Sequence, residues 1–156
     1  MINTYKVMAL TPTYNDIKAL DFGYLTGADL LAYCPFQFLA KQYAVDNLSL
    51  ETGVQTAYNE IISQLTTRYD LTSEFAKTLS DRYFLMVKIV AIASIRNILA
   101  EFQNISDNVK IHFAWLDKTL KDIREGQISL INITVQSNET VYSVASLIKS
   151  SYSTLG

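Results

Sequence analysis

The chain is poor in the residues that build disulfides, metal centres and phosphate-binding loops. Its 156 residues include one cysteine, two prolines, five glycines and one histidine. The lone Cys34 excludes an intrachain disulfide and a thiolate metal cluster, and the lone His112 excludes a histidine-rich metal site. Five scattered glycines leave no glycine-rich phosphate loop. We therefore expect no metal, no cofactor and no catalytic activity, with Cys34 a buried apolar residue and His112 a surface or boundary residue.

Long apolar runs and concentrated positive charge are also missing. The longest apolar-rich stretch, 83–99, is interrupted by Lys88, Ser94, Arg96 and Asn97, and it falls short of the roughly 18 apolar residues of a membrane span. The net charge is −2 at pH 7, without the basic face that proteins use to hold nucleic acid by its phosphates. The N-terminus lacks the pattern of a secretory leader. We expect a soluble protein that is made inside the cell, with no membrane contact.

Apolar residues at helical spacing, many of them aromatic, are abundant. Ten tyrosines and seven phenylalanines are unusual for a small domain, and aromatic side chains favour cores and interfaces. The clearest pattern spans 107–125, where apolar residues recur in steps of three and four on one helical face. Gly126 follows, and glycine can end a helix in the left-handed conformation. The apolar face consists of Val109, Phe113, Leu116, Leu120 and Ile123.

Two short helices are expected near the start of the chain. Thr26, with Asp29 three residues later, is a variant of the capping box and predicts a short helix to about residue 33. Pro35 then breaks this helix or begins a second one over about 36–44. Both are short enough to need packing against longer helices.

Two long helices fill the middle of the chain. Ser49 is a good cap for a helix over 50–69, which has one apolar side and one polar side. A connection over 70–78 follows. The next helix, over 79–102, is apolar on several sides, which places it either at the centre of a bundle or against a neighbouring subunit.

The charges divide the chain into a body and two arms. Residues 1–25 and 131–156 carry few charges, and each sums to zero, whereas the body over 26–130 carries the rest. The β-branched residues of 131–135 predict a strand, and a short helix is expected over about 141–152. We predict a mainly α protein, a four-to-five-helix bundle with extended arms and short β content in the C-terminal arm.

The order of these elements resembles a known family. A short helix opens with Asp-Leu-Leu at 29–31, a helix over 57–69 ends in Arg-Tyr, and a long apolar helix over 83–99 follows. The finish runs from Trp-Leu to Ile-Ser-Leu across 115–130. This order, over about 26–130, resembles the small head–tail connector, or adaptor, proteins of tailed bacteriophages, including the short helical group of Mu-like prophages. The chain departs from the family pattern in lacking a proline soon after Arg-Tyr and in having longer arms.

The resemblance implies a structural role in the virion. Family members form a ring beneath the portal vertex, most often of twelve copies to match the portal, around a channel through which DNA passes. The expected partners are other copies, the portal protein and tail or neck proteins, and the expected location is the phage neck after synthesis in the bacterial cytoplasm. Adaptor and stopper roles both remain open.

Several residues are candidates for subunit or partner contacts. Trp115 is either a core-edge residue or an interface anchor, because tryptophan is enriched at binding hot spots. The Arg-Tyr pair either places a cation at the negative end of the helix dipole or is the helix ending that recurs in this family. The strand over 131–135 could add to the exposed edge of a partner's sheet. The candidates are Arg68, Tyr69, Trp115, Ile131, Ile133, Val135, Tyr142 and Tyr152.

A different class of function also fits the pattern. The same apolar faces could close a two-fold interface in a stand-alone helical binding or regulatory module that acts as a dimer. A small enzyme is disfavoured because the sequence offers no nucleophile–base pair, metal cluster or phosphate loop.

Overall fold

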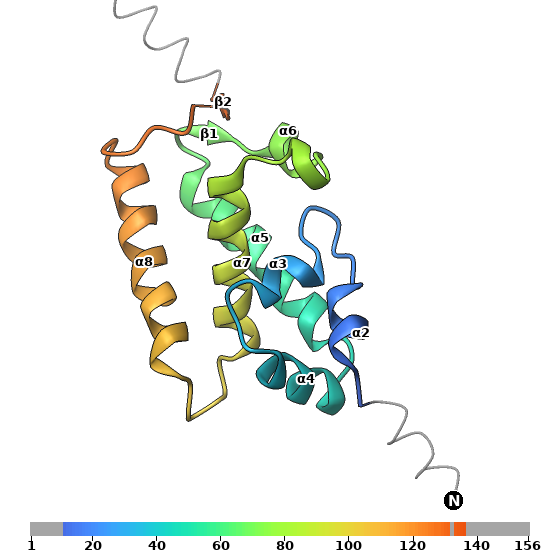
Figure 1. Ribbon diagram of the computed structural model, residues 1–156. Helices are drawn as coiled ribbons and strands as arrows, with labels where there is room; N and C mark the ends of the chain where they lie inside the picture. Colours follow the sequence, from blue (N-terminus) through green and yellow to red (C-terminus); the bar gives the residue numbers. More distant parts are fainter. Residues whose placement is uncertain (1–10, 132, 137–156) are drawn as a thin grey trace, which may run out of the picture.

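The computed structural model describes residues 11–131 and 133–136, which form a mainly helical domain (Figure 1). The expected mainly α fold class is confirmed. Seven α-helices, one 3₁₀ turn and two short strands lie in this part of the chain. In chain order they are α2 (Tyr14–Lys18), α3 (Gly27–Leu31), α4 (Phe36–Val45), α5 (Ser49–Leu65), β1 (Tyr69–Asp70), α6 (Thr72–Phe75), η1 (Leu79–Asp81), α7 (Phe84–Ile98), α8 (Asp107–Arg124) and β2 (Thr134–Val135).

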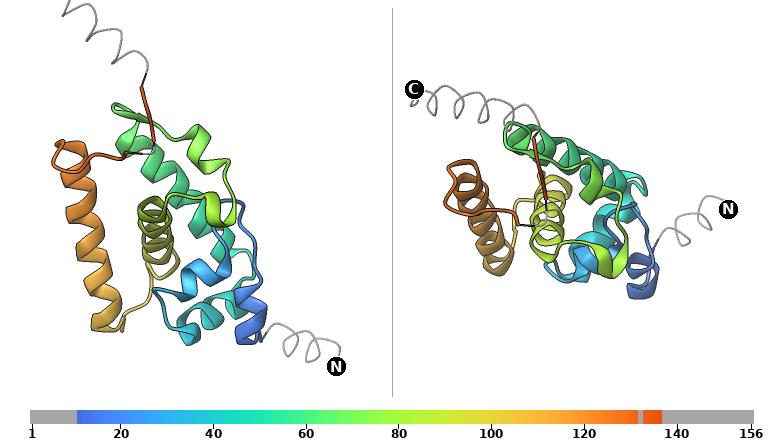
Figure 2. Two further views of the ribbon diagram at one scale, coloured as in Figure 1. Left: turned by 45° about the horizontal axis from the view of Figure 1, so that its top comes forward. Right: turned by 90° about the horizontal axis from the view of Figure 1, so that it is seen from above.

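Helix α7 is the centre of the domain. It packs most extensively against α5 and also contacts α3 and α8, so that it lies inside the molecule in both views of Figure 2. Its one buried hydroxyl, that of Ser94, donates to the carbonyl oxygen of Val90 at 2.7 Å. Apart from Phe84 at its start, the apolar surface that the sequence shows on several sides of this helix is therefore largely covered within one chain. Its buried residues are Met86, Val87, Ile89, Val90, Ala91, Ile92, Ala93, Ser94, Ile95 and Ile98.

Helices α5 and α7 run antiparallel at close range. A Cβ added to Gly53, near the start of α5, would lie 2.5 Å from the Cγ1 atom of Ile98 at the end of α7. Glycine at this position thus permits the close approach of the two backbones. The contact also fixes which ends of the two helices are neighbours.

Residues assigned from charge to the N-terminal arm belong to the same core as the helices. Helix α2 carries a capping box between Thr13 and Asp16, and its Ile17 is fully buried. Leu25 is also fully buried. The backbone N–H of Thr26 donates to the Asp29 carboxylate at 2.7 Å, which confirms the predicted capping box of the next short helix. Packing therefore joins the described residues before 26 to the body.

The two long central helices are shorter than predicted. Helix α5 ends at Leu65 rather than at 69, because Tyr69 leaves the helix, becomes buried and enters β1. Helix α7 begins at Phe84 rather than at 79, because Leu79 is left-handed with φ +51° and the backbone of Arg82 and Tyr83 is extended. It ends at Ile98 rather than at 102.

The last long helix matches the sequence pattern. The prediction over 107–125 corresponds to α8, Asp107–Arg124, which lies along the outside of α7 (Figure 1). Gly126 has φ +83°, as expected for a glycine that ends a helix. None of the helices in the described part of the chain is long and apolar enough to cross a membrane.

The β content is limited to one antiparallel pair. The strand predicted over 131–135 is shorter and covers Thr134–Val135, with Tyr69 opposite Val135 and Asp70 opposite Thr134. It therefore pairs with β1 of its own chain. The short helix predicted over 141–152 lies outside the described residues.

Candidate interaction surface

Two of the predicted contact residues connect elements within the chain. Tyr69 is 5% exposed, and its hydroxyl accepts a hydrogen bond from the backbone N–H of Leu130 at 3.1 Å. The Arg68 guanidinium lies beside Gly126, where an added Cβ would come within 2.9 Å of Nη1. Arg68 and Tyr69 thus hold the exit of α8 against the end of α5.

The C-terminal candidates are divided between core and surface. Ile133 is 6% exposed and belongs to the hydrophobic core, whereas Ile131 is 80% exposed and Val135 is 52% exposed. Tyr142 and Tyr152 lie outside the described residues. Only Ile131 and Val135 of this group therefore offer apolar surface to a partner in the described part of the chain.

Trp115 belongs to a cluster that three helices assemble. The Lys88 ammonium on α7 lies 4.1 Å from the centre of the Trp115 ring on α8 and 5.8 Å from that of Tyr33. Tyr33, just beyond α3, meets the His112 ring edge-on at 5.4 Å. Burial, and to a lesser extent the Lys88 charge, lower the pKa of His112. Tyr33 and Lys88 were not predicted as site residues, because they are far from Trp115 in sequence and no spacing pattern connects them.

A groove opens next to this cluster, between α3 and the start of α7. Its volume is about 360 Å³. Phe84 is 72% exposed and Leu79 is 69% exposed, so its apolar wall faces solvent. We call it the α3–α7 groove. Its lining residues are Asp29, Ala32, Tyr33, Leu79, Ser80, Arg82, Phe84 and Val87.

Leu79 is held in a strained conformation on the wall of this groove. A non-glycine residue in the left-handed region costs roughly 1–2 kcal/mol. Arg82 fixes the turn, because its Nε donates to the Leu79 carbonyl oxygen at 2.8 Å. The same guanidinium pairs with the Asp29 carboxylate at 2.5 Å and donates to the carbonyl oxygen of Tyr24 at 2.8 Å. The fold therefore presents a large apolar side chain to solvent from a rigid base, at a cost in backbone energy.

A buried carboxylate holds the segment that leads into the groove. Glu74 on α6 is 2% exposed and accepts hydrogen bonds from the Tyr24 hydroxyl at 2.5 Å and the Tyr83 backbone N–H at 2.6 Å. Lys77 pairs with its other oxygen at 3.0 Å. Burial alone would raise the pKa of Glu74, but the hydrogen bonds from Tyr24, Tyr83 and Lys77 outweigh it and lower that pKa. Glu74 therefore acts as a charged anchor for the turn before α7.

A second apolar surface lies where α4 turns into α5. Val45 is 76% exposed and Leu48 is 60% exposed. The Leu48 backbone N–H donates to the Asp46 carboxylate at 2.9 Å, and the Ser49 hydroxyl donates to the Gln42 carbonyl oxygen at 3.1 Å. Residues 45–51, which we call the α4–α5 corner, thus form a turn held by its own hydrogen bonds.

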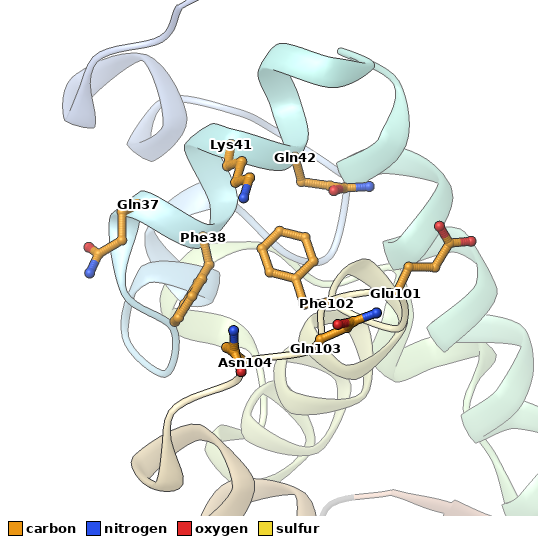
Figure 3. Close-up of a pocket in the computed structure, with 8 residues that line it drawn as sticks. All are labelled: Gln37, Phe38, Lys41, Gln42, Glu101, Phe102, Gln103 and Asn104. Carbon is orange, nitrogen blue, oxygen red and sulfur yellow. The ribbon is translucent and has the colours of Figure 1, made fainter.

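A second hollow is lined mostly by polar residues. It lies between α4 and the residues that follow α7, has a volume of about 600 Å³, and contains the Phe38 and Phe102 rings packed edge-to-face at 5.8 Å. Figure 3 shows these two rings near the centre, with Lys41 above Phe102 and the amide side chains around them. The polar residues of this hollow are exposed or half-buried, which suits contact with another surface more than a desolvated reaction centre. They are Gln37, Lys41, Gln42, Glu101, Gln103 and Asn104.

The burial of Cys34 determines the reactivity of its thiol. Cys34 is 3% exposed, which confirms its expected burial, and this burial raises the pKa of its thiol to about 12. A thiol with so high a pKa is a poor nucleophile at neutral pH. Among residues 11–131 and 133–136, no group of three or more His, Cys, Asp and Glu side chains is placed to hold a metal ion.

Comparisons of the chain with protein-family models, curated proteins and solved structures find no match.

Proposed function

We propose that this chain is a structural protein of a tailed phage that assembles into a ring, of twelve copies beneath the portal, and joins head to tail. It acts without catalysis and without a cofactor. Copies of the chain, the portal and the tail or neck proteins are its partners, and DNA passes through the ring without sequence-specific contact. The proposal begins from the resemblance of 26–130 to head–tail connectors.

One structural observation carries the proposal furthest. The chain has two separate rigid apolar surfaces, the α3–α7 groove and the α4–α5 corner. A ring needs two different faces on each subunit, so that one face of each copy meets the other face of the next. Neither surface is covered within the chain, whereas most of the central helix is.

The balance of charge is consistent with a conduit. A protein that neutralises phosphates with a basic face holds DNA tightly, and release then depends on salt. With 13 basic and 15 acidic residues, this chain has no excess of positive charge. A channel wall of this composition lets DNA slide past.

A two-fold dimer is the second candidate. The one observation that favours it is the exposure of Leu79 and Phe84. Two copies could cover these side chains by placing their α3–α7 grooves face to face. In that arrangement the α4–α5 corner stays in solvent. Removing apolar surface from the corner would then leave association unchanged, whereas it would weaken a ring.

Locating the chain in phage particles tests the proposal. Particles whose genome encodes the chain are purified, labelled with antibody against it and imaged by electron microscopy. We expect label at the head–tail junction and a ring with a single copy number after averaging. Particles without the chain, or with label elsewhere, would refute the proposal.

The C-terminal arm gives a second test. Removal of 137–156 leaves every described element in place, so circular dichroism should keep most of the helical signal. Because the arm is assigned to assembly contacts, heads and tails should then accumulate unjoined. Normal infectious particles from this deletion would rule out the assembly role of the arm. An Ile131→Ser variant of the full-length chain tests the exposed surface next to the arm.

A further inference from the structure

We infer that the α4–α5 corner of one copy docks in the α3–α7 groove of the next copy. This inference rests on the proposed function, and it names the two surfaces that a ring contact would use. The occupant of the groove is thus a second copy of this chain. Shape, position and charge each support the pairing.

The corner projects apolar side chains, and the groove offers an apolar hollow. The corner projects Val45 and Leu48, the first 76% and the second 60% exposed, from a turn that hydrogen bonds of Asp46 and Ser49 already hold. The groove is a hollow of about 360 Å³ with an apolar wall. Because both surfaces are rigid before contact, little conformational entropy is lost when they meet.

The strain at Leu79 supports a role outside the monomer. Leu79 has φ +51° and an exposed side chain, so its conformation gains little from packing in its own chain. Strained residues of this kind persist at sites of function when the surrounding structure holds them. Arg82 and its partner Asp29 supply that support. A leucine presented in this way is suited to cover the aliphatic side chains of another copy.

Position excludes contact within one chain and favours a head-to-tail arrangement. The corner precedes α5, whose Gly53 touches Ile98 at the end of α7, whereas the groove lies at the start of α7. The 15 residues of α7 span about 22 Å at 1.5 Å per residue. The corner and the groove thus lie at opposite ends of the central helix. Contacts between unlike faces repeat from copy to copy and generate a ring when the rotation closes.

Charge matches the same pairing. Glu51 is exposed at the corner, and its carboxylate is in no ion pair with another described residue. Lys88 borders the groove through its contacts with Tyr33 and Trp115, and within the described residues its ammonium also has no carboxylate partner. Glu51 of one copy placed next to Lys88 of another would attract it, whereas two corners placed together would bring their Glu51 side chains close and repel each other.

Single-cysteine chains test which faces meet. Leu48→Cys and Phe84→Cys are made separately in a Cys34→Ala background and treated with a short bismaleimide. We expect a covalent dimer in the mixture of the two chains and none in either alone, whereas a chain with both cysteines should give a ladder of multimers. Ile62→Cys, an exposed position in the middle of α5, is the matched control and should not cross-link to Phe84→Cys. Cross-linking of Phe84→Cys with itself would overturn the inference in favour of a two-fold dimer.

A charge exchange supplies an independent measurement. Lys88→Glu alone and Glu51→Lys alone should each weaken self-association by about tenfold, since each turns a surface attraction into a repulsion. The double variant should recover most of this loss. Light scattering on the same samples separates the two levels of failure. If oligomers form but the mixed cross-link and the charge rescue are both absent, the corner–groove contact is overturned and the ring is not. If oligomers are absent both in solution and in particles, the ring is overturned as well.

Discussion

Replacing Glu74 by glutamine should destabilise the domain at neutral pH without changing its shape. The carboxylate is 2% exposed and accepts hydrogen bonds from the Tyr24 hydroxyl and the Tyr83 N–H. A hydrogen bond to a charged group contributes about 1.5–3 kcal/mol and a neutral one about 0.5–1.5 kcal/mol. If the amide oxygen keeps both donors, the variant loses about 2 kcal/mol. For a domain of this size, this loss lowers Tm by about 4–8 °C.

The size of this loss should depend on pH in a defined direction. The lowered pKa of Glu74 means that the folded protein holds the charged form more strongly than the unfolded chain does. The stability from this group is therefore complete above the ordinary glutamate value of 4.5 and is lost as pH falls through the lower folded value. The Glu74→Gln variant has no such group, so its deficit should shrink below about pH 4.5.

Urea unfolding at a series of pH values measures this deficit. Trp115 is the only tryptophan and lies half-buried on α8 against Lys88, so its fluorescence reports the transition. The exposed Glu101→Gln variant is the matched control and should stay within about 0.5 kcal/mol of the parent at each pH. A deficit that is absent at pH 7, or that is as large at pH 3 as at pH 7, would refute the assignment of Glu74 as a charged anchor.

Four further substitutions have outcomes that the structure determines. Leu79→Gly should change the unfolding free energy by less than about 1 kcal/mol, because relief of backbone strain offsets the partial burial that is lost. In the same urea assay, Leu30→Ala, at a fully buried site, should lower the unfolding free energy by about 2–5 kcal/mol. Phe84→Ser, at a side chain 72% exposed, should leave Tm almost unchanged but weaken self-association in light scattering; a large fall in Tm would instead assign Phe84 to the fold. Gly126→Ala should lower Tm by about 2–4 °C in calorimetry, because φ +83° is unfavourable for alanine.

The parts of the fold that local pattern controls could be predicted from sequence. The face of α8 and its end at Gly126 follow from residue spacing and glycine chemistry, and the capping box at Thr26 follows from one carboxylate three residues later. Local pattern could not show where α5 and α7 stop. In the sequence, Tyr69 continues the apolar side of α5. In the fold, its hydroxyl accepts a hydrogen bond from the Leu130 N–H, and this tertiary contact keeps Tyr69 out of the helix.

The candidate site could be predicted only in part for the same reason. Trp115 could be singled out as a single tryptophan on an amphipathic helix, but Tyr33 and Lys88 meet it only after three helices have packed. From the sequence, Leu79 and Phe84 are large apolar residues of the kind that usually lie in a core. Their exposure depends on the turn that Arg82 and Glu74 hold before α7, and that turn depends on contacts with Tyr24 more than 50 residues away.

The pairing of β2 with β1 has a mechanical consequence. Ile133 is inserted into the core and Thr134–Val135 is bonded to Tyr69–Asp70, so the last 20 residues start from a fixed point beside the end of α5. A pulling force on the chain beyond residue 136 would load the two paired strands in shear and pass to the central helices, so a partner bound there would also hold the body under tension.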